Sequence, residues 1–494
     1  MRFLLRAWLL GLLMALPAWG HIGSPNITFE GQAGAYPVRV TIITPGVIPG
    51  RAAIHVRVLQ GKPEQVGVTP LRWDAGKKGS PPPDICQPVP GEAQLYSAEL
   101  WLMNPGAYSV WLQIKGDRGE AELMVPVNAI ATTRLTMSPK MGAGLLAFGA
   151  FLFLTMALVV AAAFRESTLP AGTLPDRRRL WISRAVSLGF AVAFGFAIFG
   201  GKRWWDAVDR DYRSNRLYKP KEMKTELRFE AGSAELHLKL DPSTFGRRAP
   251  VQLIPDHARL MHMFLIQTGA TNTMIHLHPR RLGDLEFYTT LPPIPAGSYR
   301  VYGDITHESG FAETLVGKVE IPATVAETKG MPFDRDDSWL AGSLPTTNTA
   351  SLREVRIAPD VRLQAFGLEE LTVGKEAKLE FLPVNDQGLP LPTEPYMGMA
   401  AHGVFHKDDG QVFIHLHPHG TVSTASQWLF TRRELGEAQA RKLEDNFCGP
   451  LAPGQKLLFP YIFPQAGRYQ LWVQFMSAGQ VYTAPFEITV KPAM

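Results

Sequence analysis

The segment AGSYRV at residues 296–301 recurs as PGAYSV at 105–110 and as AGRYQL at 466–471. In each copy a tyrosine lies two positions after the glycine, and an aliphatic residue lies four positions after the same glycine. Each copy opens a run of alternating apolar and polar residues, and a polar turn then leads into one more alternating run. Alternation with period two is the pattern of a β-strand with one buried face. Each copy therefore predicts a pair of antiparallel strands.

Glycine, tyrosine and an aliphatic residue at this spacing are typical of the penultimate strand of an immunoglobulin-like β-sandwich. There the tyrosine hydroxyl ties the start of the strand to a nearby loop. Because the pattern occurs three times, we expect a mainly β protein with three immunoglobulin-like β-sandwich domains. The 45 glycines and 40 prolines among 494 residues fit the many turns of such a fold. The predicted sandwiches cover residues 21–132, 223–325 and 353–494.

Two apolar stretches lie between the first and second predicted sandwiches. Residues 141–164 carry no charged side chain, and residues 185–201 form a second uncharged run. The loop between them, residues 165–184, holds five arginines. Since positively charged loops stay on the cytoplasmic side, we expect two transmembrane helices with all three sandwiches outside the cytoplasm. Residues 202–222 then form a juxtamembrane linker.

Residues 1–20 have the features of a secretion signal peptide: two arginines, an apolar centre and a small-x-small cleavage site. We therefore expect an inner (cytoplasmic) membrane protein whose soluble domains occupy the periplasm or another extracytoplasmic space. Export permits a disulfide between the two cysteines, Cys86 and Cys448, and two unpaired thiols are the alternative. The net charge of +5 is spread without a basic block, so we expect no nucleic-acid partner.

Two further segments depart from the strand pattern. Residues 326–352 combine Gly, Pro, Ser and Asp with little periodicity, and they predict a linker or an extended strap. Residues 432–446 have helical composition, and their charges predict a helix with a solvated face.

The pentapeptide Ile-His-Leu-His-Pro occurs at residues 275–279 and again at 414–418. Residues two apart on a strand share a face, so in each copy the two histidines project together while Ile and Leu point into a core. One more histidine lies thirteen or fourteen residues upstream of the first histidine of each copy, where a hairpin turn brings it beside the pair. Three neutral imidazoles suit copper or zinc. The predicted ligands are His262, His276, His278, His402, His415 and His417.

Three other residues are candidate ligands. His257 and Met274 lie close to the first histidine group in sequence, and thioethers shift the preference toward copper. His21 follows the cleavage site, so as the mature N-terminus it offers its α-amine and Nδ1 together as a copper clamp. The alternatives are that His21 merely follows the cleavage site, that the histidine pairs are only hydrogen-bonded, and that methionines fill the core.

The first sandwich, with its Gly-x-Tyr-x-Val strand and closing hairpin, resembles the YtkA-like/FixH-like immunoglobulin-type domains of exported bacterial proteins. For the FixH-like members, that resemblance implies assistance in supplying copper to terminal oxidases. Residues 255–279 and 395–418 resemble largely uncharacterised exported bacterial proteins with His-x-His-Pro motifs. This second resemblance implies secretion and metal handling.

We therefore expect a membrane-anchored extracytoplasmic copper-binding protein for sensing, storage or delivery, with a membrane complex or a metal-delivery protein as its partner. A first alternative is a structural or interaction module of a membrane complex that binds no metal. A second is a cupin-like metalloenzyme, but both copies miss the cupin spacing between glycine and His-x-His. The cupin motif also has a glutamate a few residues after His-x-His, whereas the first glutamate after His278 is Glu286, which is too far on. Motifs for nucleophilic catalysis are missing from the sequence, so we do not expect an enzyme.

Overall fold

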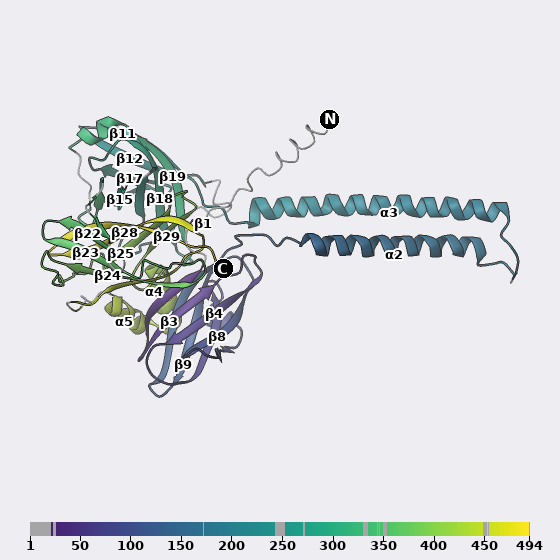
Figure 1. The fold of residues 1–494 in the computed structure, drawn as a ribbon, viewed down its shortest axis with the longest axis horizontal. Helices are drawn as coiled ribbons and strands as arrows, with labels where there is room; N and C mark the ends of the chain where they lie inside the picture. Colours follow the sequence, from purple (N-terminus) through teal and green to yellow (C-terminus); the bar gives the residue numbers. More distant parts are fainter. Residues whose placement is uncertain are drawn as a thin grey trace. The chain divides into compact units, whose positions relative to one another are not determined.

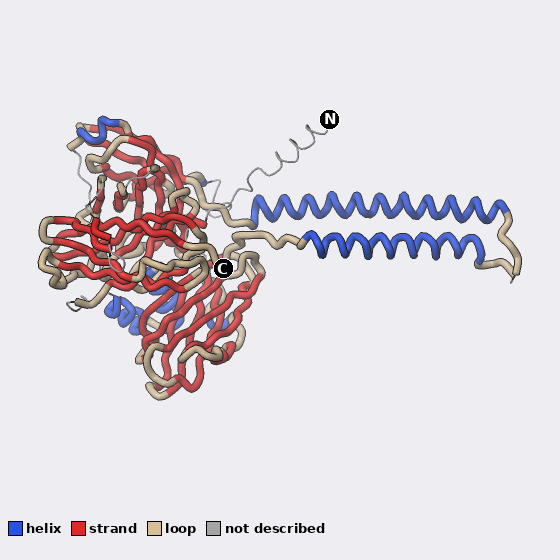
Figure 2. Tube along the Cα trace, viewed as in Figure 1, coloured by secondary structure: helices blue, strands red, loops and turns tan. Residues whose placement is uncertain are grey.

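The computed structural model describes most of the chain: residues 21–22, 26–170, 172–242, 252–269, 272–329, 334–342, 344, 346–348, 353–447, 452 and 454–493. It divides into two compact units, one of β-sheets and one, Ala131–Tyr218, of helices (Figures 1 and 2). The predicted signal peptide and Cys448 lie outside the described residues. Cys86 is a buried free thiol, and burial raises its pKa to about 12.

The first sheet pair is built from residues 27–129. One sheet has the strand order β10-β9-β5-β6, and the other has the order β2-β3-β4-β8-β7. Alternate residues of these strands, such as Val40, Ile54, Val68 and Leu112, are fully buried, as the period-two pattern requires. The strands are β2 (Ile27–Ala33), β3 (Tyr36–Ile43), β4 (Gly50–Val58), β5 (Pro63–Arg72), β6 (Asp84–Ile85), β7 (Gln87–Pro88), β8 (Leu95–Leu102), β9 (Gly106–Gly116) and β10 (Gly119–Ala129).

The second sheet pair has the orders β11-β12-β17-β16 and β13-β18-β14-β15-β20, with β19 beside β18. Ile275 and Leu277 of the first pentapeptide point into the core between these sheets, as predicted. Part of the predicted linker is a strap, because β20 adds to the edge of the sheet next to β15. The strands are β11 (Met223–Glu230), β12 (Ser233–Leu240), β13 (Leu253–Ile254), β14 (His262–Gln267), β15 (Met274–Leu277), β16 (Arg280–Gly283), β17 (Glu286–Leu291), β18 (Gly297–His307), β19 (Ala312–Ile321) and β20 (Ser338–Leu340).

The third sheet pair has the orders β21-β22-β23-β24-β27 and β1-β26-β25-β28-β29. Ile414 and Leu416 of the second pentapeptide point into its core, which confirms the predicted alternation. β1 runs parallel to β26 and places the backbone of His21 opposite Val412. The strands are β1 (His21–Ile22), β21 (Thr346–Asn348), β22 (Arg353–Ala358), β23 (Val361–Phe366), β24 (Glu376–Val384), β25 (His402–Lys407), β26 (Val412–Leu416), β27 (Leu457–Ile462), β28 (Gly467–Ser477) and β29 (Gln480–Val490).

The tyrosines of the recurring segment make the predicted ties to a nearby loop. The Tyr299 hydroxyl donates to the carbonyl of Pro295, and the Tyr469 hydroxyl donates to the carbonyl of Gln465, each at 2.8 Å. The Tyr108 hydroxyl accepts from the backbone N–H four residues upstream, at 3.2 Å. Each tyrosine begins a strand that pairs with the strand after it, as the pattern predicts.

Two helices connect β26 to β27. Helix α4 (Thr424–Leu435) begins at Ser423, whose hydroxyl accepts from a first-turn N–H, and it ends at Gly436; helix α5 (Glu437–Phe447) follows. The charged side chains Arg432, Arg433 and Glu437 are exposed, as predicted for this insert. Helix α4 starts earlier than predicted, and its other face packs on the first sheet pair. Phe430 is fully buried there, and the Gln427 amide donates to the carbonyl of Met124 at 2.8 Å.

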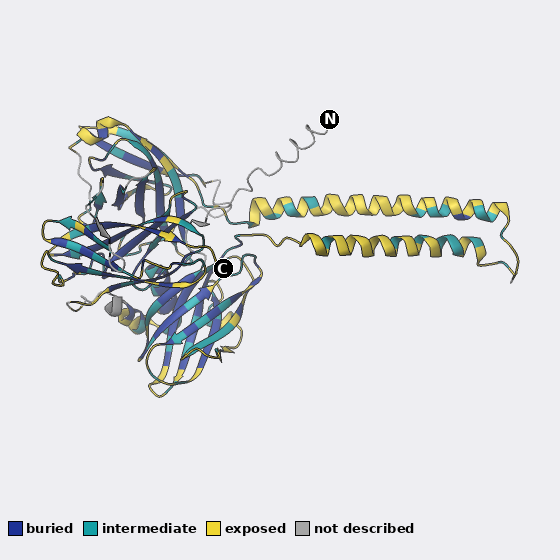
Figure 3. Cartoon of the chain, in the orientation of Figure 1, coloured by how far each residue is buried: buried dark blue, intermediate teal, exposed yellow. Residues whose placement is uncertain are grey.

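The helical unit contains α2 (Pro139–Glu166) and α3 (Arg177–Asp211), and a π-helical turn (Tyr212–Arg216) continues α3. Both helices are long and apolar enough to cross a membrane. They contain the two predicted spans, and most of their side chains are exposed in the isolated chain, as Figure 3 shows. We treat them as candidate transmembrane helices.

A candidate metal centre between two sheets

The histidine pairs lie on sheet faces that are buried against each other. On one side of this interface, β14, β15 and β18 present Phe264, Met274 and Tyr302 outward, away from the core of the second sheet pair. The third sheet pair presents Phe413 and Trp472 against them, and all five side chains form one apolar cluster. The rings of Tyr302 and Phe413 stack with centroids 4.0 Å apart. The histidines that share these faces are therefore buried in an interface.

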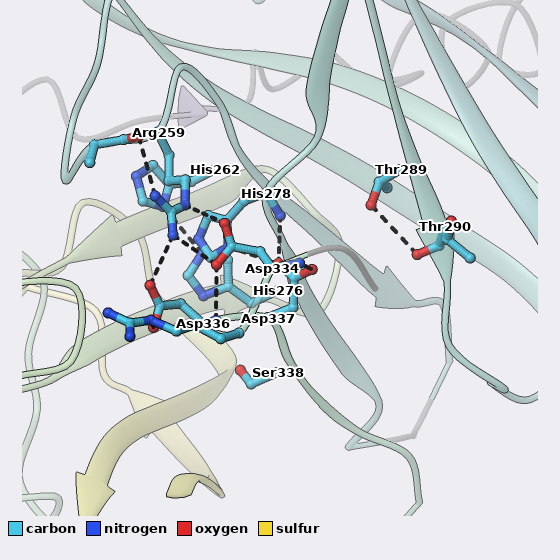
Figure 4. Close-up of polar contacts among 12 residues, drawn as sticks. Arg259, His262, His276, His278, Thr289, Thr290, Asp334, Asp336, Asp337 and Ser338 are labelled. Carbon is cyan, nitrogen blue, oxygen red and sulfur yellow. Dashed lines mark hydrogen bonds and ion pairs between the residues drawn. The ribbon is translucent and has the colours of Figure 1, made fainter. Parts of the chain in front are cut away.

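The first triad consists of His262, His276 and His278, all of them buried. His262 begins β14 and the other two lie on or just after β15, so the hairpin brings the three rings together as predicted. Figure 4 shows the three side chains converging beside Arg259 and Asp337. One nitrogen from each ring lies within 4.8 Å of the others.

The second triad consists of His402, His415 and His417 and has the same construction on β25 and β26. Its nitrogens also lie within 4.8 Å of one another. The preceding turns match as well, because positive φ angles occur at His257 in one copy and at Met397 in the other. The second and third sheet pairs therefore repeat one arrangement of histidines.

Hydrogen bonds to oxygen atoms fix which nitrogen of each ring in the first triad carries the proton. His262 Nε2 lies 3.1 Å from the carbonyl of Asp256, and His276 Nδ1 lies 2.9 Å from Oε1 of Gln474. His278 Nδ1 lies 2.8 Å from Oδ1 of Asp337. A carbonyl oxygen can only accept, so the outer nitrogen donates its proton and the inner nitrogen keeps a bare lone pair. Outer N–H donation of this kind is the usual support of a metal-binding histidine.

The second triad has one equivalent hydrogen bond. His402 Nε2 lies 3.0 Å from the carbonyl of Tyr396, and His415 Nδ1 faces Oδ2 of Asp304 at the longer distance of 3.4 Å. In each triad the third ring has a buried Nε2 atom, that of His278 or His417, without a hydrogen-bond partner among the described residues. Buried polar atoms are rarely left without a partner. Two such atoms, each aimed at two other lone pairs, fit a metal ligand set.

The spacing of the lone pairs also fits a metal ion. His262 Nδ1 lies 3.3 Å from His276 Nε2, and His402 Nδ1 lies 3.0 Å from His415 Nε2. Two nitrogens of one tetrahedral site with bonds of 2.0–2.1 Å are separated by roughly 3.3 Å. In the first pair both nitrogens are acceptors in the tautomers above, so a cation between them removes their mutual repulsion. The residues present therefore fit a metal ion with tetrahedral or trigonal coordination.

Burial sets the charge of both triads. It lowers the pKa of His262 to about 4, with a smaller contribution from His257. Burial, followed by repulsion between neighbouring rings, holds the pKa of the other five rings well below 6.5. Burial also raises the pKa of Asp304 and of Asp337 to about 7. All six imidazoles are therefore neutral at pH 7, the form that binds metals.

The other candidate ligands are placed differently. The His257 ring contacts the rings of His402 and His417, but its Nε2 lies 3.2 Å from Thr424 Oγ1 and it also hydrogen-bonds to the backbone of Met397. The Met274 side chain belongs to the apolar cluster. For His21 only the backbone position is described, on the sheet edge beside β26. Their roles as ligands remain predictions.

Two histidines near the second triad have partners outside it. His406 Nε2 lies 3.1 Å from the Tyr302 hydroxyl, and His419 Nδ1 lies 3.1 Å from the carbonyl of Glu30. Both rings therefore hydrogen-bond to groups outside the triads.

Sequence reasoning missed the supporting acceptors Asp304, Gln474 and Asp337. A signal for two of them exists, because Asp304 and Gln474 each follow the tyrosine of the recurring segment by five residues. They therefore occupy the same place on β18 and β28. Asp337 lies in the strap before β20, where only three-dimensional packing reveals that it contacts His278.

Residues 359–492, from β23 to β29, match the family described as a domain of unknown function (DUF8832). No curated protein matches the chain. Among solved structures, a tetra-tandem repeat of a large adhesion protein has 7% identity and a TM-score of 0.16, covering 90% of this chain and 71% of that one.

Two bacterial α2-macroglobulins also appear among the similar structures. The Salmonella protein reacted with methylamine has 8% identity and a TM-score of 0.19, covering 96% of this chain and 24% of that one. The native E. coli protein has 9% identity and a TM-score of 0.20, covering 94% of this chain and 23% of that one. At TM-scores this low, none of these structures bears on function.

Proposed function

We propose that the two histidine triads bind transition-metal ions, and that the protein is a membrane-anchored, extracytoplasmic copper-binding protein for storage or delivery. One observation carries this proposal. In each triad, nitrogens of three imidazoles converge, and one of them has no partner among the described residues. In the first triad, outer N–H donation fixes the lone pairs that face the centre.

The donor set supports copper as the metal. Imidazole nitrogens bind Cu, Zn, Ni and Fe, whereas Ca²⁺ and Mg²⁺ take oxygen ligands. For one set of nitrogen ligands, copper binds more tightly than zinc. The ligand atoms grouped in each triad are all imidazole nitrogens, so copper is the preferred ion and zinc the second choice.

The burial of the triads supports storage or slow delivery. His276 and His402 are fully buried, and His278 is 3% exposed. All three rings of the first triad are buried, so an ion held there leaves only when the interface between the second and third sheet pairs opens locally, and such opening is slow. His415 of the second triad is partly exposed, so we expect its ion to exchange faster.

The remaining features support a proposal for the placement of the protein. We propose that each sheet pair is an immunoglobulin-like sandwich, supported by the three tyrosine ties. The apolar helices α2 and α3 would anchor the chain in the inner membrane, with the arginine-rich loop in the cytoplasm. The resemblance of the first sandwich to FixH-like domains supports a copper-supply partner in the same membrane.

A metal titration of the full chain in detergent tests this function. The metal-free protein is titrated with Cu(I), Cu(II) and Zn(II), and bound metal is counted after desalting. We expect two ions in the triads, and we expect both to be lost in a variant with His276, His278, His415 and His417 replaced by glutamine. A control with His55→Ala and His237→Ala, outside both triads, should keep two ions. The proposal is wrong if the glutamine variant remains folded by circular dichroism and binds as much metal as the control.

A further inference from the structure

We propose that the two triads form one dinuclear metal centre, in which each sheet pair orients histidines of the other. This inference rests on the proposed metal-binding function. It goes further by assigning the two ions to a single site that exists only when the second and third sheet pairs are docked.

The rings of the two triads are in direct contact. The centroid of His415 lies 5.3 Å from that of His262 and 5.7 Å from that of His276. The centroids of His276 and His402 lie 6.3 Å apart. Within the triads the centroids lie 4.7–5.5 Å apart, so the contacts between the triads are only slightly longer than those within them. Because a ligating ring has its centroid roughly 3 Å from the ion, the two ions share one cluster of rings.

The acceptors that orient the rings are exchanged between the sheets. Gln474 lies opposite His402 in the register of β28 and β25, yet its Oε1 accepts from His276 of the second sheet pair. Asp304 lies opposite His262 in the register of β18 and β14, yet its carboxylate faces His415 of the third sheet pair. Gln474 of the third sheet pair therefore supplies the outer hydrogen-bond acceptor for a histidine of the second, and the Asp304 carboxyl of the second lies beside a histidine of the third.

His257 adds a third link across the interface. It precedes β14 of the second sheet pair, but its ring lies against His402 and His417, with centroids 5.4 and 4.7 Å away. Its Nε2 contacts Thr424 of α4. His257 is therefore a positioning residue that the second sheet pair contributes to the second triad.

The exchanged acceptors give a test that a purely structural role cannot imitate. Two double variants of the full chain each keep one triad intact. His415→Gln with His417→Gln retains the first triad, and His276→Gln with His278→Gln retains the second. Gln474→Leu should weaken Cu(II) binding about 10–100-fold at the first triad and leave the second unchanged. Asp304→Leu should do the reverse. Gln474→Glu and Asp304→Asn, which keep an acceptor oxygen, should restore most of the affinity.

Electron paramagnetic resonance of the wild-type chain loaded with two Cu(II) ions tests the shared centre itself. We expect a spectrum broadened by spin coupling that differs from the sum of the two single-triad spectra. The inference is overturned if the spectrum equals that sum, or if each leucine substitution acts on the triad of its own sheet pair. Two bound ions with additive spectra would leave the proposed function intact, whereas a wild-type chain that binds no metal would refute both.

Discussion

The Nδ1 atom of His276 lies 2.9 Å from Oε1 of Gln474, a residue 198 positions later in the chain. The amide of Gln474 is held in turn by Ser338 of the strap and by Thr483 of β29. A ligand candidate of the second sheet pair is thus oriented by a side chain of the third. The histidine site and the packing of the two sheet pairs are therefore one structural feature.

The carboxylate of Asp337 orients His278. Its Oδ1 accepts from His278 Nδ1 and from the backbone N–H of the same residue, both at 2.8 Å. Asp337→Ala frees the ring to rotate, so we expect copper affinity of the first triad to fall about 10–100-fold. Isothermal titration of the background that retains only this triad measures the change. Asp284→Ala, at an exposed turn, is the matched control, and equal affinities of the two variants would contradict the role of Asp337.

The stability of the metal-free protein should fall as the pH falls, in part because of His406. Burial lowers the pKa of His406 to about 3, whereas the unfolded ring titrates near 6.5. The unfolded chain then binds more protons, so the contribution of the neutral ring is complete above about pH 6.5 and is lost as the pH falls toward 3. His406→Phe should reduce the slope of unfolding free energy against pH by up to about 1.4 kcal/mol per pH unit.

Urea unfolding of the full chain at several pH values between 4 and 7 measures this slope. The matched control is Tyr302→Phe, which removes the hydroxyl that lies 3.1 Å from His406 Nε2 but keeps the imidazole. It should lower stability at every pH without changing the slope. An unchanged slope in His406→Phe would show that this ring titrates alike in the folded and unfolded protein.

Phe430 anchors α4 to the first sheet pair. It is fully buried in a cluster with Leu71, Ala107 and Met124. Phe430→Ala should lower the free energy of unfolding by about 3–5 kcal/mol and speed hydrogen exchange in α4 and in β10. Arg432→Ala, on the exposed side of the same helix, should change stability by less than about 0.5 kcal/mol. Equal exchange rates in the two variants would mean that α4 is not docked in solution.

The orientation in the membrane can be tested by labelling single cysteines. In a chain with Cys86 and Cys448 replaced by serine, a cysteine at Thr173 lies in the arginine-rich loop and one at Gln387 lies in an exposed turn of the third sheet pair. An impermeant maleimide should label the Gln387 position in spheroplasts and the Thr173 position only after lysis. The opposite pattern would reverse the proposed topology.

Local patterns in the sequence predicted much of the fold and the six triad histidines. The tyrosine of each recurring segment and the alternation around each pentapeptide depend on neighbours in the chain, so the strands and their inward faces follow from them. The contact of His415 with His262 does not follow from such local patterns, because it depends on which sheet faces pack together. The docking of α4 was not predicted for the same reason, because the contact of Phe430 with the first sheet pair joins segments that are far apart in the sequence.

The most direct test of the central claim is an anomalous difference map of copper-loaded crystals of the full chain, measured at the copper absorption edge. We predict two peaks, each bonded at roughly 2 Å to three imidazole nitrogens. One should lie among His262 Nδ1, His276 Nε2 and His278 Nε2, and the other among His402 Nδ1, His415 Nε2 and His417 Nε2. A map without peaks at the triads, or with peaks only elsewhere, for instance at His21, would contradict the account.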